Sequence, residues 1–161
     1  MDIYLIRHAD ARPLGEGGIT QDEDRPLSDE GIAQAAALAR ALQRHGVQLS
    51  RALTSPLLRA RQTAEGMLGA WPAPAPELEA CECLAPGARP KELARFLRRS
   101  GGDHVALVGH QPDLGRFAAW LVGSKNAQID LAKAGVAYVT CDDQPRKRTG
   151  TLVWLVTPDW Y

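Results

Sequence analysis

Two short apolar runs in which polar and apolar residues do not alternate stand out along the chain. They are Ile3–Ile6, with the sequence Ile-Tyr-Leu-Ile, and His104–Gly109, with the sequence His-Val-Ala-Leu-Val-Gly. Continuous apolar residues over this length are typical of a strand that is buried on both faces, as in a parallel sheet. Arg51–Thr54 and Glu77–Cys83 carry weaker versions of this pattern, so the sequence predicts four strands up to Gly109.

Four segments have the composition and spacing of helices. They are Gly31–Arg44, the stretch from Ser55-Pro56 to about Leu68, Arg89–Arg99 and Pro112–Val122. The first is rich in alanine, and the side chains spaced to face a core are Ile32, Ala35, Ala36, Ala39 and Leu42. Ser28 is a suitable N-cap and Gly46 a suitable C-cap for this helix, and Ser55 is a suitable N-cap for the next. Arg12–Pro26, rich in glycine, proline and charge, is an expected surface loop.

Two further strands, Val136–Cys141 and Thr151–Thr157, end the chain. The polar and basic turn region between them favours an antiparallel hairpin. Before this hairpin, strands and helices alternate, which is typical of an α/β domain around a mostly parallel sheet. A length of 161 residues is usual for one domain, and neither a linker nor an internal repeat interrupts it. We therefore expect residues 1–161 to form a single domain.

The balance of positive and negative charge argues against two classes of binding partner. Lys plus Arg number 19 and Asp plus Glu number 19, so the formal net charge is zero. Nucleic-acid-binding proteins and basic membrane binders depend on excess positive charge, so we expect neither class. No apolar stretch reaches the roughly 18 residues of a spanning helix, and Met1–Arg7 has no basic leader of the kind that begins a signal peptide. The expected location is the cytoplasm.

The cysteines predict neither a disulfide framework nor a metal site. There are three, Cys81, Cys83 and Cys141, and an odd count with one closely spaced pair does not indicate disulfide pairing. A Cys-x-Cys pair without a second pair of ligands is also a poor zinc signature. We expect two or three reduced thiols, and we expect no metal and no other cofactor.

Four residues with the chemistry of a phosphate site follow the ends of predicted strands. Arg7 and His8 follow the first strand, Arg59 lies in the helix that follows Arg51–Thr54, and His110 follows the strand that ends at Gly109. In sheets of this class, ligands bind beyond the carboxyl ends of the strands. The sequence therefore predicts that two arginines and two histidines gather at one edge of the sheet.

This residue set suits the transfer of a phosphoryl group. Neutral imidazole is a nucleophile that is available near neutral pH. The charge on the phosphoryl oxygens needs cationic donors in fixed positions, and the planar guanidinium group supplies them. A single histidine or arginine at such a position more often has a structural role than a catalytic one. His45, His104 and the solvent-facing Arg61 are residues of these types that we expect to have no part in the site. The prediction therefore depends on the combination of four residues.

The same residues resemble the motifs of the histidine phosphatase superfamily, whose fold is phosphoglycerate mutase-like. Arg7-His8-Ala9 resembles its opening Arg-His-Gly motif, and Thr54–Ala64, which contains Arg59, resembles its second motif. Val108-Gly109-His110-Gln111-Pro112 resembles the third, and Arg25-Pro26-Leu27-Ser28-x-x-Gly31 matches an early segment. The resemblance spans Ile3 to about Gly123, with the same order and spacing.

The resemblance implies a three-layer α/β/α sandwich whose central sheet is parallel except for one strand. It implies that His8 is the phosphorylated nucleophile, that Arg7 and Arg59 bind phosphate, and that His110 is the second histidine of the pocket. Ala9 departs from the usual glycine, which puts the fine shape of the pocket in question. Only one short helix and a proline-rich loop separate the second and third motifs, and this compact length resembles the SixA-like phosphohistidine phosphatases. An uncovered pocket suits a phosphorylated protein as the partner.

The sequence does not identify which residue donates a proton to the leaving group. Glu82, Asp113 and Asp10 are the candidates for a general acid, and each also suits an exposed or helix-capping role. Two other functions also stay open: a phosphatase for small phosphate esters, and a phosphate-binding module without turnover. The presence of all four pocket residues favours an enzyme over such a module.

Overall fold

The sheet at the centre of the molecule has six strands in the order β3–β2–β4–β1–β5–β6. The computed structural model describes residues 1–161, and its strands are β1 (Asp2–Arg7), β2 (Arg51–Thr54), β3 (Leu78–Ala80), β4 (His104–Gly109), β5 (Val136–Cys141) and β6 (Gly150–Val156). The pairs β1–β4, β4–β2 and β2–β3 are parallel, whereas β5 pairs antiparallel with both β1 and β6. Only β5 therefore runs against the others, which confirms the expected sheet.

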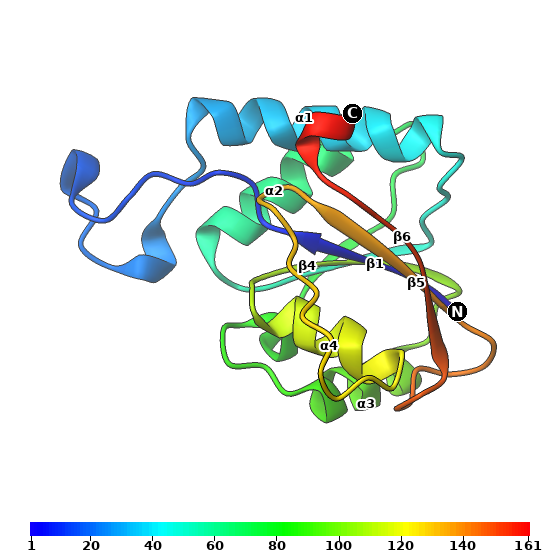
Figure 1. Ribbon diagram of the computed structural model, residues 1–161. Helices are drawn as coiled ribbons and strands as arrows, with labels where there is room; N and C mark the ends of the chain where they lie inside the picture. Colours follow the sequence, from blue (N-terminus) through cyan, green and yellow to red (C-terminus); the bar gives the residue numbers. More distant parts are fainter.

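The helices form one layer on each face of this sheet. They are α1 (Asp29–Arg44), α2 (Leu58–Gly69), α3 (Pro90–Ser100) and α4 (Asp113–Leu121). Figure 1 shows α1 and α2 on one side of the sheet and α3 and α4 on the other, so the predicted three-layer sandwich is confirmed. None of the helices combines the length with the apolar composition that a membrane crossing requires.

The two apolar runs are buried on both faces because they form the central strands β1 and β4. Ile3 and Leu5 of β1 pack into the core beneath α3 and α4. Tyr4 and Ile6, which alternate with them, pack into the core beneath α1 and α2. The residues of β4 divide between the two cores in the same way. Successive side chains of a strand point to opposite faces, so a strand covered on both sides has no polar alternation.

Two helix predictions need correction. The second helix, α2, begins at Leu58 instead of directly after Ser55, because Leu57 still has an extended backbone. The hydroxyl of Ser55 accepts from the N–H of Leu57 at 3.3 Å and also faces His110. In α1, Ile32 is exposed although its spacing predicted a core position. The preceding Gly31 lies against the backbone of Asp10 so closely that a Cβ atom there would overlap the Asp10 carbonyl oxygen. This contact turns Ile32, one residue further around the helix, toward solvent.

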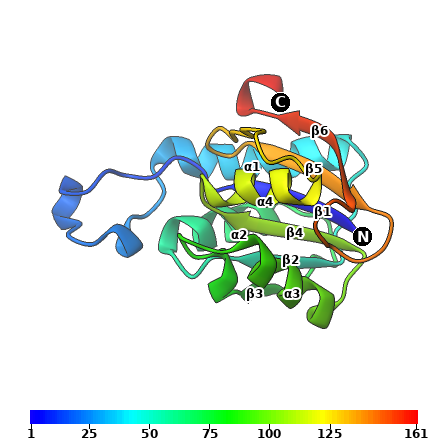
Figure 2. The same ribbon diagram turned by 60° about the horizontal axis from the view of Figure 1, so that its bottom comes forward.

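The loop between β1 and α1 projects away from the sandwich (Figure 2). It contains two short 3-10 turns, η1 (Glu16–Gly18) and η2 (Asp22–Asp24). An isolated antiparallel bridge between Ala11 and Leu27 closes its base. The expectation of a surface loop over Arg12–Pro26 is confirmed.

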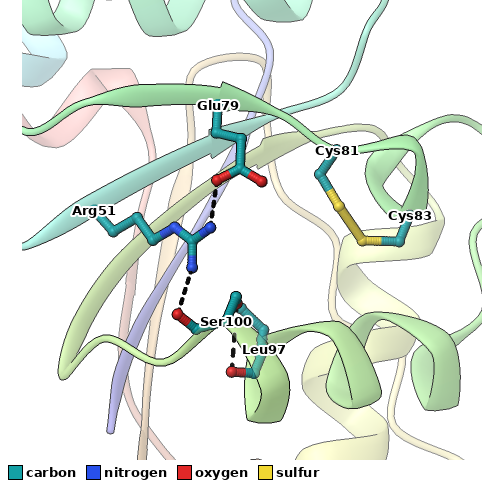
Figure 3. The surroundings of a disulfide bond; sticks show 6 residues. All are labelled: Arg51, Glu79, Cys81, Cys83, Leu97 and Ser100. Carbon is teal, nitrogen blue, oxygen red and sulfur yellow. Dashed lines mark hydrogen bonds and ion pairs between the residues drawn. A yellow bond between two sulfur atoms is a disulfide. The ribbon is translucent and has the colours of Figure 1, made fainter.

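The expectation of two or three reduced thiols is wrong, because one pair is oxidised and a single thiol is left. Cys81 and Cys83 form a disulfide, and their Cα atoms are 5.3 Å apart (Figure 3). The predicted third strand ends earlier than expected, at Ala80, and the 3-10 turn η3 (Glu82–Leu84) folds Cys83 back beside Cys81. Sequence spacing alone does not show this turn. Cys141 is free and buried in β5.

Candidate active site

The carboxyl ends of β1, β2 and β4 bring the predicted pocket residues together. The backbone N–H of His8 donates to the carbonyl of Gly109 at 3.0 Å, which places His8 beside the residue that precedes His110. The two imidazole centroids are 5.1 Å apart, and both rings are buried. Arg59 lies in the first turn of α2 and reaches the His8 ring. The predicted convergence at one sheet edge is thus present.

Hydrogen bonds fix which nitrogen of His8 carries the proton and which carries the lone pair. Nδ1 lies 2.8 Å from the carbonyl oxygen of Ala9, and because a carbonyl oxygen only accepts, Nδ1 must carry the proton. The lone pair is therefore on Nε2, which accepts a hydrogen bond from Nε of Arg59 at 3.2 Å. Burial lowers the pKa of His8 to about 4, and the charges of Arg59, Arg7 and Arg25 act in the same direction. His8 is thus a neutral base near pH 7.

This low pKa predicts the protonation state of His8 over a wide pH range. A histidine pKa lowered from 6.5 moves the gain of the proton to more acidic pH, so the ring stays neutral from pH 7 down to about pH 5. We expect ¹⁵N NMR of the histidine rings to show a protonated Nδ1 and a free Nε2 on His8 throughout that interval. A His8 titration midpoint near 6.5, or a proton on Nε2 at pH 7, would contradict this assignment.

Arg59 uses all three of its nitrogens. Besides the bond from Nε to His8, Nη1 donates to the backbone carbonyl of Asp22 at 2.7 Å and Nη2 donates to its carboxylate at 2.9 Å. The Arg59 side chain is only 6% exposed, whereas that of Arg61 is 51% exposed and pairs with Glu65 on the helix surface. The structure therefore buries Arg59 and exposes Arg61, as the sequence predicted.

Arg7 and His110 each keep one buried nitrogen without a hydrogen-bond partner. Nη1 of Arg7 donates to the carbonyl of Leu131 at 2.7 Å, but its Nε is unpartnered. Nε2 of His110 lies 2.8 Å from the hydroxyl of Ser55, but its Nδ1 is unpartnered. Burial lowers the pKa of His110 to about 3, and the nearby His8 adds to this effect. Because unpartnered buried polar groups are rare, these two nitrogens are suited to a polar ligand.

Ala9 fits the backbone of the pocket without a glycine. Its N–H donates to the hydroxyl of Thr63 at 3.0 Å, and that hydroxyl donates to the carbonyl of Arg59 at 2.7 Å. The methyl group is fully buried in a small cluster with Leu27, Ala35 and Ala134. The φ angle of Ala9 is not positive. Alanine therefore fits at this position without disturbing the backbone that follows His8.

The three predicted candidates for a general acid lie in different settings. Asp113 shares a small cavity with His110, but its carboxylate accepts from the N–H of Gly87 at 2.7 Å and pairs with Arg116. Asp10 pairs with Lys133 and accepts from Ser28. Glu82 is exposed, makes no side-chain hydrogen bond and lines a different surface cavity. Only Asp113 is beside the pocket, and it already has two partners.

The structure adds two side chains that sequence reasoning missed. Ser55 touches His110, although its position before Pro56 had indicated a helix cap. Asp22 touches both Arg59 and Arg25, although it lies in a loop where several acidic residues have the same sequence signature. The loop composition carries no signal that selects Asp22, since this contact depends on how the loop folds over α2.

Arginine side chains supply positive charge to this pocket. The structure contains no group of three or more His, Cys, Asp or Glu side chains arranged to hold a metal ion. Arg7 and Arg59 already place cationic groups beside His8 and can neutralise phosphoryl oxygens. We expect hydrolysis to continue at an unchanged rate in EDTA. Loss of activity on chelation that a divalent ion restores would contradict this expectation.

Comparison with known proteins gives consistent matches over most of the chain. The family model described as "Histidine phosphatase superfamily (branch 1)" matches residues 3–84. An uncharacterised protein of Picosynechococcus sp. is 37% identical over 140 residues, which cover 84% of this chain and 82% of that protein. The phosphohistidine phosphatase SixA of Escherichia coli (strain K12) is 28% identical over 163 residues, covering 98% of this chain and 94% of that protein. The solved structure of the protein histidine phosphatase SixA complexed with tungstate superimposes with a TM-score of 0.86 at 26% identity, covering 99% of this chain and 98% of that chain.

Proposed function

This chain belongs to the histidine phosphatase superfamily (branch 1) and is a phosphatase, and we propose that it removes phosphate from phosphohistidine in a protein partner. The observation that carries this proposal is the state of the carboxylates around the pocket. Asp113, beside His110, is held by Gly87 and Arg116, and Asp22 is held by two arginines. An alkoxide leaves poorly without a proton donor, whereas the imidazole of phosphohistidine departs more readily.

The proposed reaction has two displacements at phosphorus. In the first, the lone pair on Nε2 of His8 forms a bond to phosphorus while the bond from phosphorus to the substrate nitrogen breaks. The substrate ring carries a proton on its other nitrogen, so it keeps that electron pair and departs as neutral imidazole. In the second, a water oxygen bonds to phosphorus and gives one proton to bulk water, the bond to His8 breaks, and phosphate and neutral His8 are released. The unprotonated Nε2 and the protonated Nδ1 of His8 supply the nucleophile in the required form.

Arg7, Arg59 and His110 are the proposed ligands of the phosphoryl oxygens. The unpartnered Nε of Arg7 and Nδ1 of His110 are donors without a role inside the protein. The hydroxyl of Ser55 can donate to Nε2 of His110, which leaves the proton of His110 on Nδ1 and directs it toward phosphate. Fixed donors of this kind stabilise the charge that develops on the phosphoryl oxygens during transfer.

A cleft beside the pocket offers contact surface for a protein substrate. It has a volume of about 670 Å³, and Gln111, which follows His110, lies in its wall. Its cationic side chains are Arg116, Lys125 and Lys147. A protein that carries phosphohistidine can contact the pocket and this cleft together, whereas a small phosphate ester has too few atoms to do so. This supports a macromolecular substrate.

A second candidate function is the hydrolysis of small phosphate esters. The position of Asp113 beside His110 favours it, because release of Asp113 from Gly87 would free a carboxyl group near the leaving atom. Family membership, with all four pocket residues in place, gives no support to a phosphate-binding module without turnover.

We expect kcat/KM for a phosphohistidine-containing protein or peptide to exceed kcat/KM for a sugar phosphate. The test compares both substrates in the wild-type protein, Asp113→Asn and Glu82→Gln. On the proposed account, neither substitution affects phosphohistidine hydrolysis by more than a few fold, because neither carboxylate takes part in it. If the ester is the better substrate and Asp113→Asn removes only that activity, then Asp113 is the general acid and the second candidate function is the correct one.

A further inference from the structure

One carboxylate of the projecting loop reaches into the phosphate pocket. Oδ1 of Asp22 accepts a hydrogen bond from Nη1 of Arg25 at 3.0 Å, and Oδ2 accepts one from Nη2 of Arg59 at 2.9 Å. Its backbone carbonyl accepts from Nη1 of Arg59 at 2.7 Å. The next two residues, Glu23 and Asp24, are also acidic but make no ion pair or side-chain hydrogen bond. Of these three consecutive acidic residues, Asp22 is therefore the one that contacts the arginines.

Asp22 binds the two terminal nitrogens of Arg59, which lie on the side of the guanidinium group that faces away from His8. Both terminal nitrogens of the guanidinium group bind Asp22, while Nε points at Nε2 of His8. A guanidinium group is planar and rigid, so fixing its terminal nitrogens also fixes the direction of Nε–H. We infer that Asp22 is a positioning residue that aims Arg59 at the phosphoryl group on His8. This inference rests on the proposed roles of His8 and Arg59, and it applies to any phosphate substrate.

Hydrogen bonds within the loop hold Asp22 in position. Nε of Arg25 donates to the carbonyl of Arg12 at 2.7 Å, so Arg25 is tied to the opposite side of the loop. Asp22 is in turn tied to Arg25 and joins the loop to Arg59. Arg59 is buried, and a buried cation without a partner is strongly destabilised, so Asp22 also keeps the guanidinium group in place.

The contacts of Asp22 do not suit a general acid. The hydrogen bond from Arg25 lowers the pKa of the Asp22 carboxyl group, and the hydrogen bond from Arg59 lowers it further. The group is therefore ionised near pH 7, and both of its oxygens act as acceptors. A carboxylate in this state holds donors in position and has no proton to give.

The experiment is a double-mutant cycle between Asp22 and Arg59. We expect Asp22→Ala to lower kcat/KM about 10- to 100-fold, the range for the loss of one hydrogen bond between charged groups. The affinity for tungstate, used as a phosphate analogue, should fall with it. In an Arg59→Ala background, Asp22→Ala should cause no further loss in either quantity, because no guanidinium group remains to be positioned. Asp22→Asn, which keeps one accepting oxygen, should lose less than Asp22→Ala.

Glu23→Ala is the matched control, since it removes an adjacent acidic side chain without contacts, and it should retain wild-type activity. Activity is first measured on a phosphohistidine peptide and on p-nitrophenyl phosphate. The compound that the wild-type protein hydrolyses faster is then used for all variants. Tighter tungstate binding by Asp22→Ala would show that Asp22 competes with phosphate. Equal losses in both backgrounds would show a purely structural role, and unchanged tungstate affinity with loss of ester hydrolysis alone would show a general acid. Each of these overturns the inference, whereas an unaffected Arg59→Ala variant would instead overturn the proposed site.

Discussion

Arg59→Ala is expected to lose about 100- to 1,000-fold in kcat/KM, whereas Arg61→Ala is expected to stay close to the wild type. The loss corresponds to about 2.7–4 kcal/mol of transition-state stabilisation, the range measured when one fixed donor is removed from a site of developing negative charge. Arg59 is buried and donates to Nε2 of His8 at 3.2 Å. Arg61 lies two residues further along α2, about 200° around the helix, and pairs with Glu65 at the surface.

The two arginine variants form a matched pair, because both remove the same side chain from the same helix. Removing Arg59 also leaves Asp22 without one of its partners, so thermal unfolding of each variant must be measured beside its activity. Equal losses of activity in two folded variants would place the phosphate site on another face of α2.

His8→Ala is expected to lose all measurable turnover, a decrease on the order of 10⁴-fold or more, because His8 is the proposed site of the covalent intermediate. Nε2 of His8 holds the free lone pair at the meeting point of three strands. His110 is the other histidine of the pocket, but its Nε2 lies against the hydroxyl of Ser55. Steady-state kinetics on a phosphohistidine peptide and on p-nitrophenyl phosphate measure the loss.

His45→Ala serves as the control for this substitution. His45 follows the last residue of α1 and lies beside the ring of Trp154, away from the pocket, so its removal should leave turnover intact. A His8→Ala variant that is folded and retains substantial activity would show that another residue is the nucleophile.

The sequence was sufficient to predict the sheet and the four pocket residues because both follow from local patterns. Apolar runs without alternation identified β1 and β4 as strands covered on both faces. Parallel strands then place the residues that follow them at one edge, which brought His8 and His110 together. Arg59 was placed there by the helix that follows β2, and the motif resemblance assigned phosphate binding to Arg59 and not to Arg61.

Contacts that depend on how distant segments meet were not predictable. Asp22 is one of three consecutive acids, and only the fold of the loop over α2 selects it as the partner of Arg59. Ser55 has the sequence signature of a helix cap, and its hydroxyl does accept from the N–H of Leu57, but the local pattern does not show that it also contacts His110. Ile32 has the spacing of a core residue, but the close approach of Gly31 to Asp10 turns it outward. In each case a tertiary contact gives the residue a role or position that the local pattern does not show.

The most direct test of the mechanism is to locate the phosphoryl group during turnover. Wild-type protein is mixed with radiolabelled substrate, quenched with alkali, which preserves phosphohistidine, and digested for peptide mapping. The account predicts an acid-labile phosphate on the peptide that contains His8, absent from His8→Ala and present in His45→Ala. A label on any other residue, or turnover with no labelled peptide in a quench fast enough to resolve one cycle, would contradict the claim that His8 carries the phosphoryl group.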